Sequence, residues 1–304
     1  MERIRVLATD DLANEGIEAL KAQPQFDVHV APSMAEDALA ELVKDFHALL
    51  VRSKTRVTRR VVESAGRLKL IGRAGSGLDN IDSEAALARG IEVVNAPQGN
   101  AVTTAEYTIA LLFALARFVP QAHESLRQGR WEKTAFLGTE LRGKTLGLLG
   151  IGHIGSEVAE LACGIKMRVI AHDPFVKEHK LIKLVSRDAL LKSCDFLSVH
   201  IPLNAQTKHT IGTAELAEMK KGAFVLNAAR GGIIDEQALL HALNSGHIAG
   251  AACDVFEEEP PPKTHLFLKH PRIIVTPHLG ASTKEAQVKV STIIAQKTIE
   301  FFKA

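Results

Sequence analysis

The 304-residue sequence predicts an α/β protein with two doubly wound parallel sheets. Short apolar segments rich in β-formers alternate with segments of helical spacing along nearly the whole chain, which is the pattern of strands joined by crossover helices. The expected strands are nearly continuous apolar runs, as in sheets that are covered on both faces. A domain usually contains about 100–200 residues, so the chain has room for two of them.

The N-terminal part of the chain predicts the first sheet. Strands are expected at 5–9, 26–31, 47–53, 68–75 and 91–95, with helices at 12–23, 34–45, 58–66 and 83–90 between them. Gly90 marks the end of the last of these helices. The cluster of turn-forming residues NAPQGN at 95–100 then interrupts the alternation, and it predicts a domain boundary.

The rest of the chain predicts a second α/β domain. A long apolar helix is expected at 101–118, and a less regular stretch at 120–143 contains the single tryptophan. The alternation resumes with strands at 144–150, 167–173, 196–202, 223–229, 247–256 and 272–278, and helical patterns lie between most of them. One amphipathic helix is expected at 282–304.

Composition excludes several classes of protein. Lys and Arg total 37 and Asp and Glu total 35, so the net charge of +2 is too small for a general nucleic-acid-binding protein. Cys163, Cys194 and Cys253 are far apart and form no CxxC pair, which argues against a disulfide framework or a zinc site. The histidines show no metal-ligand spacing. The N-terminus has no signal-peptide pattern and the apolar run at 108–118 is short for a membrane span, so we expect a cytoplasmic protein.

The segment GIGHIG at 150–155 predicts a dinucleotide site. It lies between an expected strand and an expected helix, where Gly150 makes a tight turn, Gly152 lets the backbone approach a pyrophosphate, and Gly155 lets the helix pack on the sheet. Asp173 ends the next strand, about 20 residues further on, where an acid binds the ribose hydroxyls. This acid repels a 2′-phosphate, and no Arg follows it, so we expect NAD rather than NADP. The alternative is a plain glycine turn with a helix-capping Asp.

Polar side chains also follow the last three expected strands. The residues at these strand ends are Arg230, then Asp254 with the three glutamates 257–259, and then His278. The carboxyl ends of parallel strands share one edge, so these groups can converge there. A histidine can accept a hydroxyl proton, a carboxylate can orient the imidazole, and a guanidinium can bind a carboxylate with two hydrogen bonds. The set suits a 2-hydroxy or 2-keto acid, although each residue singly is more often an ion pair, a solvated loop or a structural histidine.

Several motifs together resemble those of the D-isomer-specific 2-hydroxyacid dehydrogenases. They are GIGHIG, HDP (172–174), NAARGGIIDE (227–236), AACDVFEEEP (251–260) and PHLGASTKEAQ (277–287), and they occur in the order of that family. The resemblance covers nearly the whole chain. It implies a Rossmann NAD-binding domain at 98–282, inserted into a flavodoxin-like substrate (lid) domain that is formed by 1–97 and 283–304.

The resemblance also implies roles for single residues. Arg230 would bind the substrate, His278 would be the acid/base, and Glu259, which directly precedes a proline, would pair with His278. The expected cofactor contacts are Ser76, Gly150, Gly152, His153, Ile154, Gly155, Asp173, Ile201, Ala228, Ala229, Arg230, Asp254, His278, Gly280 and Ala281. The expected substrate contacts are Arg52, Ser53, Arg73, Gly75, Ser76, Gly77, Asn100, Arg230 and His278.

The activity that the resemblance implies is NAD-dependent oxidation of D-3-phosphoglycerate to 3-phosphohydroxypyruvate, the first step of L-serine biosynthesis. One alternative is another D-2-hydroxyacid dehydrogenase, which acts on glycerate, hydroxypyruvate or glyoxylate. The other is a non-catalytic NAD sensor like the corepressors of this fold. A homodimer through the NAD-binding domain is expected, in which Lys133 could reach the neighbouring subunit's site. Because the chain ends at Ala304, we expect a form without the serine-binding regulatory domain that longer members carry.

Overall fold

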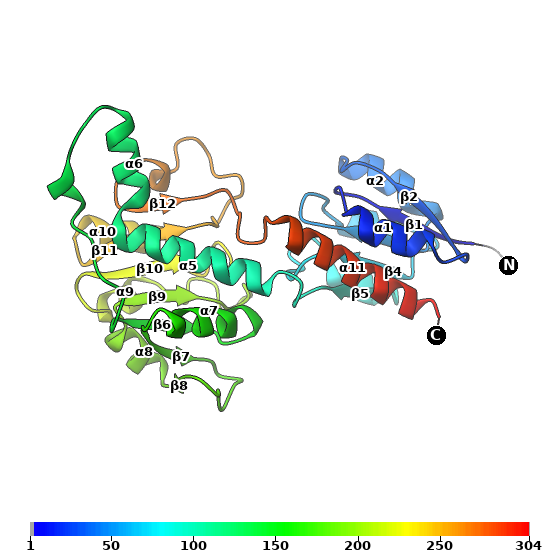
Figure 1. Cartoon of the computed structure of the whole chain (residues 1–304). Coiled ribbons are helices and arrows are strands. Elements are labelled where there is room, and N and C mark those ends of the chain that lie inside the picture. Colours follow the sequence, from blue (N-terminus) through cyan, green and yellow to red (C-terminus); the bar gives the residue numbers. More distant parts are fainter. Residues whose placement is uncertain (1–2, 304) are drawn as a thin grey trace. The chain divides into compact units, whose positions relative to one another are not determined.

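The structure is a computed structural model, and it describes residues 3–303. The chain forms two compact units, the first from Met1–Ala101 with Ala281–Ala304 and the second from Val102–Gly280. Each unit has its own parallel sheet (Figure 1). The expected fold class, α/β with two doubly wound parallel sheets, is confirmed.

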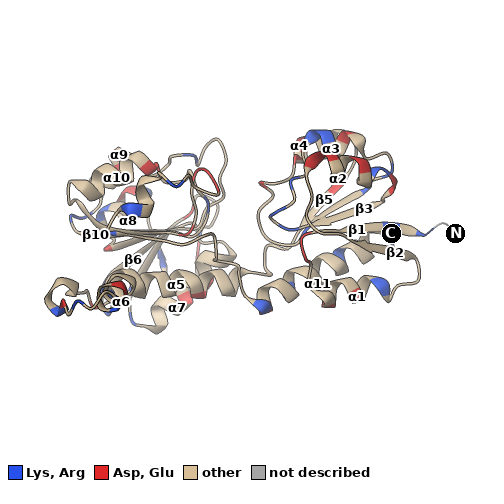
Figure 2. Ribbon diagram, turned by 90° about the horizontal axis from the view of Figure 1, so that it is seen from above, with Lys and Arg blue, Asp and Glu red and all other residues tan. Residues whose placement is uncertain are grey.

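The first unit contains a five-stranded sheet in the order β2-β1-β3-β4-β5, which is the flavodoxin-like order. Its strands are β1 (Ile4–Ala8), β2 (Phe26–Val30), β3 (Ala48–Val51), β4 (Leu70–Arg73) and β5 (Glu92–Asn95). Its helices are α1 (Asn14–Lys21), α2 (Glu36–Leu42), the 3₁₀ turn η1 (Val43–Asp45), α3 (Arg59–Ser64), α4 (Ser83–Ala88) and α11 (Lys284–Phe301). Helices α1 and α11 cover one face of the sheet, and α2, α3 and α4 cover the other (Figure 2).

The second unit contains a seven-stranded sheet in the order β12-β11-β10-β9-β6-β7-β8, which is the Rossmann order with one more strand. Its strands are β6 (Thr145–Leu149), β7 (Arg168–His172), β8 (Lys183–Leu184), β9 (Phe196–Val199), β10 (Ala223–Asn227), β11 (Ile248–Cys253) and β12 (Ile273–Val275). Its helices are α5 (Ala101–Arg117), α6 (Val119–Arg127), α7 (His153–Gly164), α8 (Arg187–Ser193), α9 (Thr213–Glu218) and α10 (Glu236–Asn244), with 3₁₀ turns η2 (Lys133–Phe136) and η3 (Leu266–Lys269).

Two apolar cores cover the faces of this second sheet. Helices α5 and α7 pack on one face, and α8, α9 and α10 pack on the other (Figure 2). The central strands β6, β9 and β10 are buried along their length because both faces are covered, which explains their mostly apolar sequence. The carboxyl ends of the strands are therefore the part of the sheet where polar groups from separate segments can gather.

The structure differs from the sequence prediction in four segments. The irregular stretch at 120–143 contains α6, which begins after Phe118 takes a left-handed conformation (φ 54°) and ends α5. The two-residue strand β8 was not predicted. The expected strand at 272–278 is only Ile273–Val275, because the residues after it turn towards Asp254. The last helix begins at Lys284, where the Thr283 hydroxyl caps it by accepting from the Ala286 N–H.

Among residues 3–303 no single helix is long and apolar enough to cross a membrane, and α5 and α6 pass that test only as a pair bent by 61°.

Candidate active site

The expected site residues of the second unit lie at the carboxyl ends of its strands. The strand order reverses between β6 and β9, and ligands of doubly wound sheets bind at such a point. The residues that follow these strands are Gly150 after β6, Asp173 after β7, Ile201 after β9, Ala228, Ala229 and Arg230 after β10, Asp254 after β11, and His278 and Gly280 after β12.

The glycine turn has the geometry that a dinucleotide needs. Gly150 has a positive φ of 96°, and a Cβ built there would lie 2.6 Å from the His200 carbonyl oxygen. A Cβ on Gly155 would overlap the Gly150 carbonyl oxygen, so only glycine lets α7 approach the turn. No described atom lies within 4 Å of a Cβ built on Gly152.

The N-terminus of α7 fits a pyrophosphate. Gly152 is the N-cap residue, so no side chain there accepts from the first N–H groups of the helix, which begins with His153 and Ile154. The N–H groups at a helix N-terminus attract anions. Together with the open space at Gly152, this end of the helix can hold the phosphates of NAD.

Asp173 links the turn to the end of β7. Its carboxylate accepts hydrogen bonds from the Ile151 N–H at 3.0 Å and from the Phe175 N–H at 2.9 Å. A carboxylate has about four lone-pair sites, so both oxygens can still accept from ribose hydroxyls. Asp173 therefore fits the adenosine ribose of NAD.

His278 and Glu259 form a hydrogen-bonded pair. Nδ1 of His278 lies 2.7 Å from Oε2 of Glu259, and the other oxygen of Glu259 accepts from the Phe256 N–H at 3.1 Å. Nε2 of the imidazole is thus the nitrogen that can exchange a proton with a substrate. Burial opposes ionisation of Glu259, but the hydrogen bond and charge of His278, the Phe256 N–H and the charge of Arg230 together lower its pKa.

Arg230 is held by its own turn. The buried side chain of Asn227 donates to the Arg230 carbonyl oxygen at 2.9 Å and accepts from the Ala229 N–H at 3.1 Å. The Arg230 guanidinium donates to the Ala229 carbonyl oxygen at 2.7 Å. The sequence reasoning missed Asn227, although a polar residue at the end of a buried strand was a usable signal.

Asp254 organises the segment that carries His278. It is fully buried, and its carboxylate accepts from the Thr276 hydroxyl at 2.6 Å and from the N–H groups of Leu279 and Gly280, each at 2.8 Å. Its carbonyl oxygen accepts from the His278 N–H at 2.8 Å. Burial raises the pKa of Asp254, while Thr276, the two N–H groups and His278 oppose that rise. The expected nicotinamide contact is thus a carboxylate that also shapes its own loop.

Two further expected cofactor contacts lie close to these groups. The Ile201 side chain would lie 2.8 Å from a Cβ on Gly150, and a Cβ on Gly280 would lie 3.3 Å from the Asp254 carboxylate. Both residues are therefore next to the turns that form the site. The expected contacts Ser76 and Ala281 belong to the first unit.

The expected substrate contacts of the first unit gather at the carboxyl ends of β3, β4 and β5. They are Arg52, Ser53, Arg73, Gly75, Ser76, Gly77 and Asn100. The structure brings together two groups that are distant in sequence, since the Ser76 hydroxyl donates to the Asn100 side chain. The Asn95 side chain donates to the Ser76 carbonyl oxygen at 2.6 Å.

A buried carboxylate holds the loop with Arg52. Asp10 is 2% exposed and accepts from the N–H groups of Arg52 and Thr55, both at 2.9 Å. The Asn80 side chain donates to the carbonyl oxygens of the same two residues at 2.7 Å. Sequence reasoning missed Asp10 and Asn80 because most of their partners are backbone groups far along the chain, which leave no pattern in the sequence.

Comparison with known proteins gives consistent results. The sequence profile of the D-isomer specific 2-hydroxyacid dehydrogenase NAD binding domain matches residues 109–280. D-3-phosphoglycerate dehydrogenase of Archaeoglobus fulgidus is 44% identical over 304 residues, which cover 99% of this chain and 58% of that protein. The chain spans about half the length of the curated relatives it matches.

Solved structures of similar length also match. The TT0316 protein from Thermus thermophilus has a TM-score of 0.91 and 33% identity, with 99% of this chain and 97% of that chain covered. A glyoxylate reductase from Paecilomyes thermophila has a TM-score of 0.88 and 32% identity, with 99% and 95% covered. Residues 109–280 form an NAD-binding domain, and the chain belongs to the D-isomer specific 2-hydroxyacid dehydrogenase family.

Proposed function

We propose that the protein is an NAD-dependent dehydrogenase that oxidises D-3-phosphoglycerate to 3-phosphohydroxypyruvate. The observation that carries the proposal is the His278–Glu259 hydrogen bond of 2.7 Å, at the same edge of the sheet as the glycine turn and Arg230. The substrate is supported by relatives such as the Archaeoglobus fulgidus protein, which carry the name of this activity. The proposed reaction is the entry step of L-serine biosynthesis.

The residues of the second unit suit each part of the oxidation. Arg230 binds the substrate carboxylate with two hydrogen bonds, which fixes the neighbouring hydroxyl-bearing carbon. Nε2 of His278 accepts the hydroxyl proton, and Glu259 stabilises the imidazolium that forms. Bound NAD⁺ supplies the acceptor for the hydride that leaves this carbon. In the reverse reaction His278 returns the proton to the carbonyl oxygen.

Cationic side chains of the first unit suit a phosphorylated substrate. Arg52 directly follows β3, and Arg73 is the last residue of β4. Both therefore lie at the carboxyl edge of the first unit's sheet. Asp10 and Asn80 hold the backbone of the Arg52 loop, which gives its side chain a fixed base. A guanidinium binds phosphate oxygens with two parallel hydrogen bonds. We assign Arg52 and Arg73 to the phosphate, and Ser53, the Gly75–Gly77 turn and Asn100 to the rest of the substrate.

A substrate panel tests this assignment. The purified protein is assayed with phosphohydroxypyruvate, hydroxypyruvate, glyoxylate and 2-oxoglutarate, with NADH and NADPH in separate reactions. We expect the highest kcat/KM with phosphohydroxypyruvate and NADH. A preference for glyoxylate or hydroxypyruvate would instead favour the reductase hypothesis, which the similarity to the Paecilomyes thermophila enzyme supports. Binding of NADH without turnover of any of these acids would favour the NAD-sensor hypothesis.

We also propose a homodimer that forms through the second unit. The support is a run of exposed apolar residues in and after α6, which includes Leu126 (58% exposed), Trp131 (83%) and Leu137 (88%). Exposed apolar side chains that form a contiguous patch are typical of a protein–protein interface. Lys133 lies within this run and could reach a partner's site. Cytoplasmic localisation stays a prediction of the sequence.

A further inference from the structure

A partly buried hydrogen bond between a carboxylate and an imidazole lies in the second unit, beside the segment that carries Glu259. Glu236 is the first residue of α10, and its Oε2 lies 2.9 Å from Nε2 of His265, with both side chains 15% exposed. The Phe267 N–H donates to Nδ1 of His265 at 3.3 Å, so Nδ1 is an acceptor and Nε2 carries the proton that Glu236 accepts. The ring of His265 packs edge-on against Phe256 and Phe267. The pair is therefore fixed in one orientation.

The same carboxylate also holds the other end of the Glu259 segment. Oε1 of Glu236 accepts from the Glu257 N–H at 3.0 Å. Glu257 and His265 lie on either side of Glu259 in the sequence, so one carboxylate joins the beginning and the end of the segment from 257 to 265. These two bonds go to the ends of the segment and not to Glu259 itself. Glu236 therefore influences the position of the Glu259 side chain by fixing the backbone on either side of it.

Two further contacts hold the beginning of this segment. His209 lies with Nε2 2.9 Å from a Glu257 carboxylate oxygen and with Nδ1 3.9 Å from Asp235. A Cβ on Gly231 would overlap the Phe256 carbonyl oxygen, so the turn after Arg230 packs directly on the Phe256–Glu257 peptide. The position of Glu259 is thus set relative to the turn that holds Arg230.

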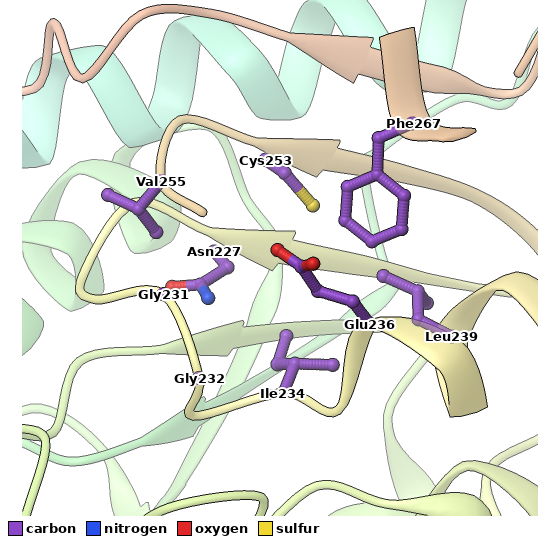
Figure 3. Close-up of a pocket in the computed structure, with 9 residues that line it drawn as sticks. All are labelled: Asn227, Gly231, Gly232, Ile234, Glu236, Leu239, Cys253, Val255 and Phe267. Atoms are coloured by element: carbon purple, nitrogen blue, oxygen red, sulfur yellow. The ribbon is translucent and has the colours of Figure 1, made fainter. Parts of the chain in front are cut away.

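The side chain of Glu236 lies in surroundings that disfavour a carboxylate. Its carboxylate points into a small pocket (Figure 3). The residues that line this pocket are mostly apolar or small: Asn227, Gly231, Gly232, Ile234, Leu239, Cys253, Val255 and Phe267. A carboxylate is tolerated there because both of its oxygens have donors. Removing it leaves the Glu257 N–H and His265 without their acceptor.

We propose that Glu236 is a positioning residue, which holds the segment from 257 to 265 so that Glu259 stays within hydrogen-bond distance of His278. The inference rests on the proposed function, because it makes Glu236 act on the acid/base pair of that reaction. Catalytic groups must keep their geometry closely, and a misplacement of about 1 Å can cost about 10²-fold in rate. A residue that does not touch the substrate can therefore have a measurable effect on kcat.

The kinetic test compares Glu236→Ala, Glu236→Gln and Glu215→Ala with the wild type. Glu215, in α9 of the same unit, accepts from the Gly212 N–H and pairs with Arg187, so its removal costs similar interactions elsewhere. We expect Glu236→Ala to lower kcat about tenfold or more while the Kd for NADH is unchanged. Glu236→Gln keeps an acceptor for the Glu257 N–H and should recover part of kcat. Glu215→Ala should lose thermal stability but keep its kcat.

A second readout needs no turnover, so it separates this inference from the proposed function. The pKa of Glu259, which His278 and its other partners lower, can be followed by carboxyl ¹³C NMR and assigned with Glu259→Gln. We expect this pKa to rise in Glu236→Ala and to stay unchanged in Glu215→Ala. If both alanine variants lose stability but neither changes kcat or the Glu259 titration, Glu236 is only structural and the proposal is overturned. If the wild type turns over none of the acids, the proposed function fails while the NMR arm still decides the role of Glu236.

Discussion

His278 lies in the left-handed backbone region with φ 54°, which few residues other than glycine adopt. Such a conformation persists where surrounding contacts impose it, and here Asp254 provides them through its carbonyl oxygen and its carboxylate. The tight turn directs the imidazole towards Glu259 instead of continuing β12. The short length of β12 and the position of the His278 imidazole therefore have the same cause.

Replacing His278 by Asn tests its assigned role. The variant keeps a polar side chain but cannot accept the hydroxyl proton, so kcat should fall by about 10²–10⁴-fold, the usual contribution of general acid–base catalysis. NADH binding, measured by fluorescence titration, should be nearly unchanged because the glycine turn and Asp173 are untouched. An equal loss of NADH affinity would count against the assignment.

Glu259 should make stability depend on pH. Burial opposes its charge, but His278, the Phe256 N–H and Arg230 lower its pKa in the folded state. A carboxyl group with a lowered folded pKa stabilises the fold above its unfolded pKa of about 4.3, and this contribution disappears as the pH falls through the folded pKa. We expect Glu259→Gln to be less stable than the wild type in urea at pH 7 and to approach it below about pH 4. Glu258→Gln, at an exposed neighbouring position, is the control. A pH-independent difference between Glu259→Gln and the wild type would contradict this prediction.

At the residue scale, sequence and resemblance pointed to some groups and missed others for a physical reason. The sequence offered three consecutive glutamates, and the structure places Glu259 against His278 and Glu257 against His209. Asn227 and Glu236 were missed because their main partners are backbone groups or residues far along the chain. A motif records which side chains are present, but it does not record which distant N–H groups they meet.

At the scale of single elements, the turn between β6 and α7 separates two uses of glycine. Gly155 is required for packing, since a Cβ there would overlap the Gly150 carbonyl oxygen. Gly152 is not required for packing, because no described atom lies within 4 Å of a Cβ built on it. The open space is where a pyrophosphate would approach the N-terminus of α7.

The two glycines therefore predict different variants. Gly152→Ala should keep nearly the wild-type melting temperature but bind NADH about tenfold or more weakly, a loss of about 1.4 kcal/mol. Gly155→Ala should lose both stability and NADH affinity, because α7 must move away from the turn. Thermal unfolding without ligand and NADH titration measure the two effects. Unchanged NADH affinity in Gly152→Ala would place the pyrophosphate elsewhere.

Helices and strands were predictable where the apolar pattern of the sequence agrees with burial. They were not predictable where the conformation of a single residue ends an element, or where an element is very short. The buried strands β6, β9 and β10 have mostly apolar sequence and were predicted. Helix α6 was missed because the end of α5 depends on the left-handed conformation of Phe118, a residue with no turn signal. Strand β8 has only two residues and pairs with β7 alone, so it has too little pattern to detect.

At the scale of the whole molecule, the alternation of strands and helices along the chain does not predict the strand order of either sheet. Alternating strands and helices predict parallel sheets, but they do not say where the order reverses. The resemblance supplied that information, and the observed orders are those of a flavodoxin-like and a Rossmann sheet. Because the strands of each sheet are parallel, the expected site residues that follow them lie at the carboxyl edge of that sheet.

The segment in and after α6 exposes apolar side chains that do not belong to the core of either sheet. Figure 1 shows α6 leading away from the second sheet, and the apolar residues of the segment, Val119, Leu126, Trp131 and Leu137, are more than half exposed. Leaving so many large apolar groups in water costs about 25 cal/mol for each Å² that a partner could cover. A second copy of the chain provides an identical apolar segment, and twofold interfaces of this kind are common.

The single tryptophan allows a direct test of the proposed dimer. Trp131 is 83% exposed in one chain, so burial by a second copy should shift its fluorescence to shorter wavelength. We expect a dimer mass by sedimentation at micromolar concentration, with a red shift of the emission on dilution as the dimer dissociates. Leu126→Glu should give a monomer with red-shifted emission at every concentration, because it places a charge within the apolar segment. Leu87→Glu, at a position 79% exposed in the first unit, should leave mass and emission unchanged. A wild-type monomer with red-shifted emission at micromolar concentration would show that this segment is not a dimer interface.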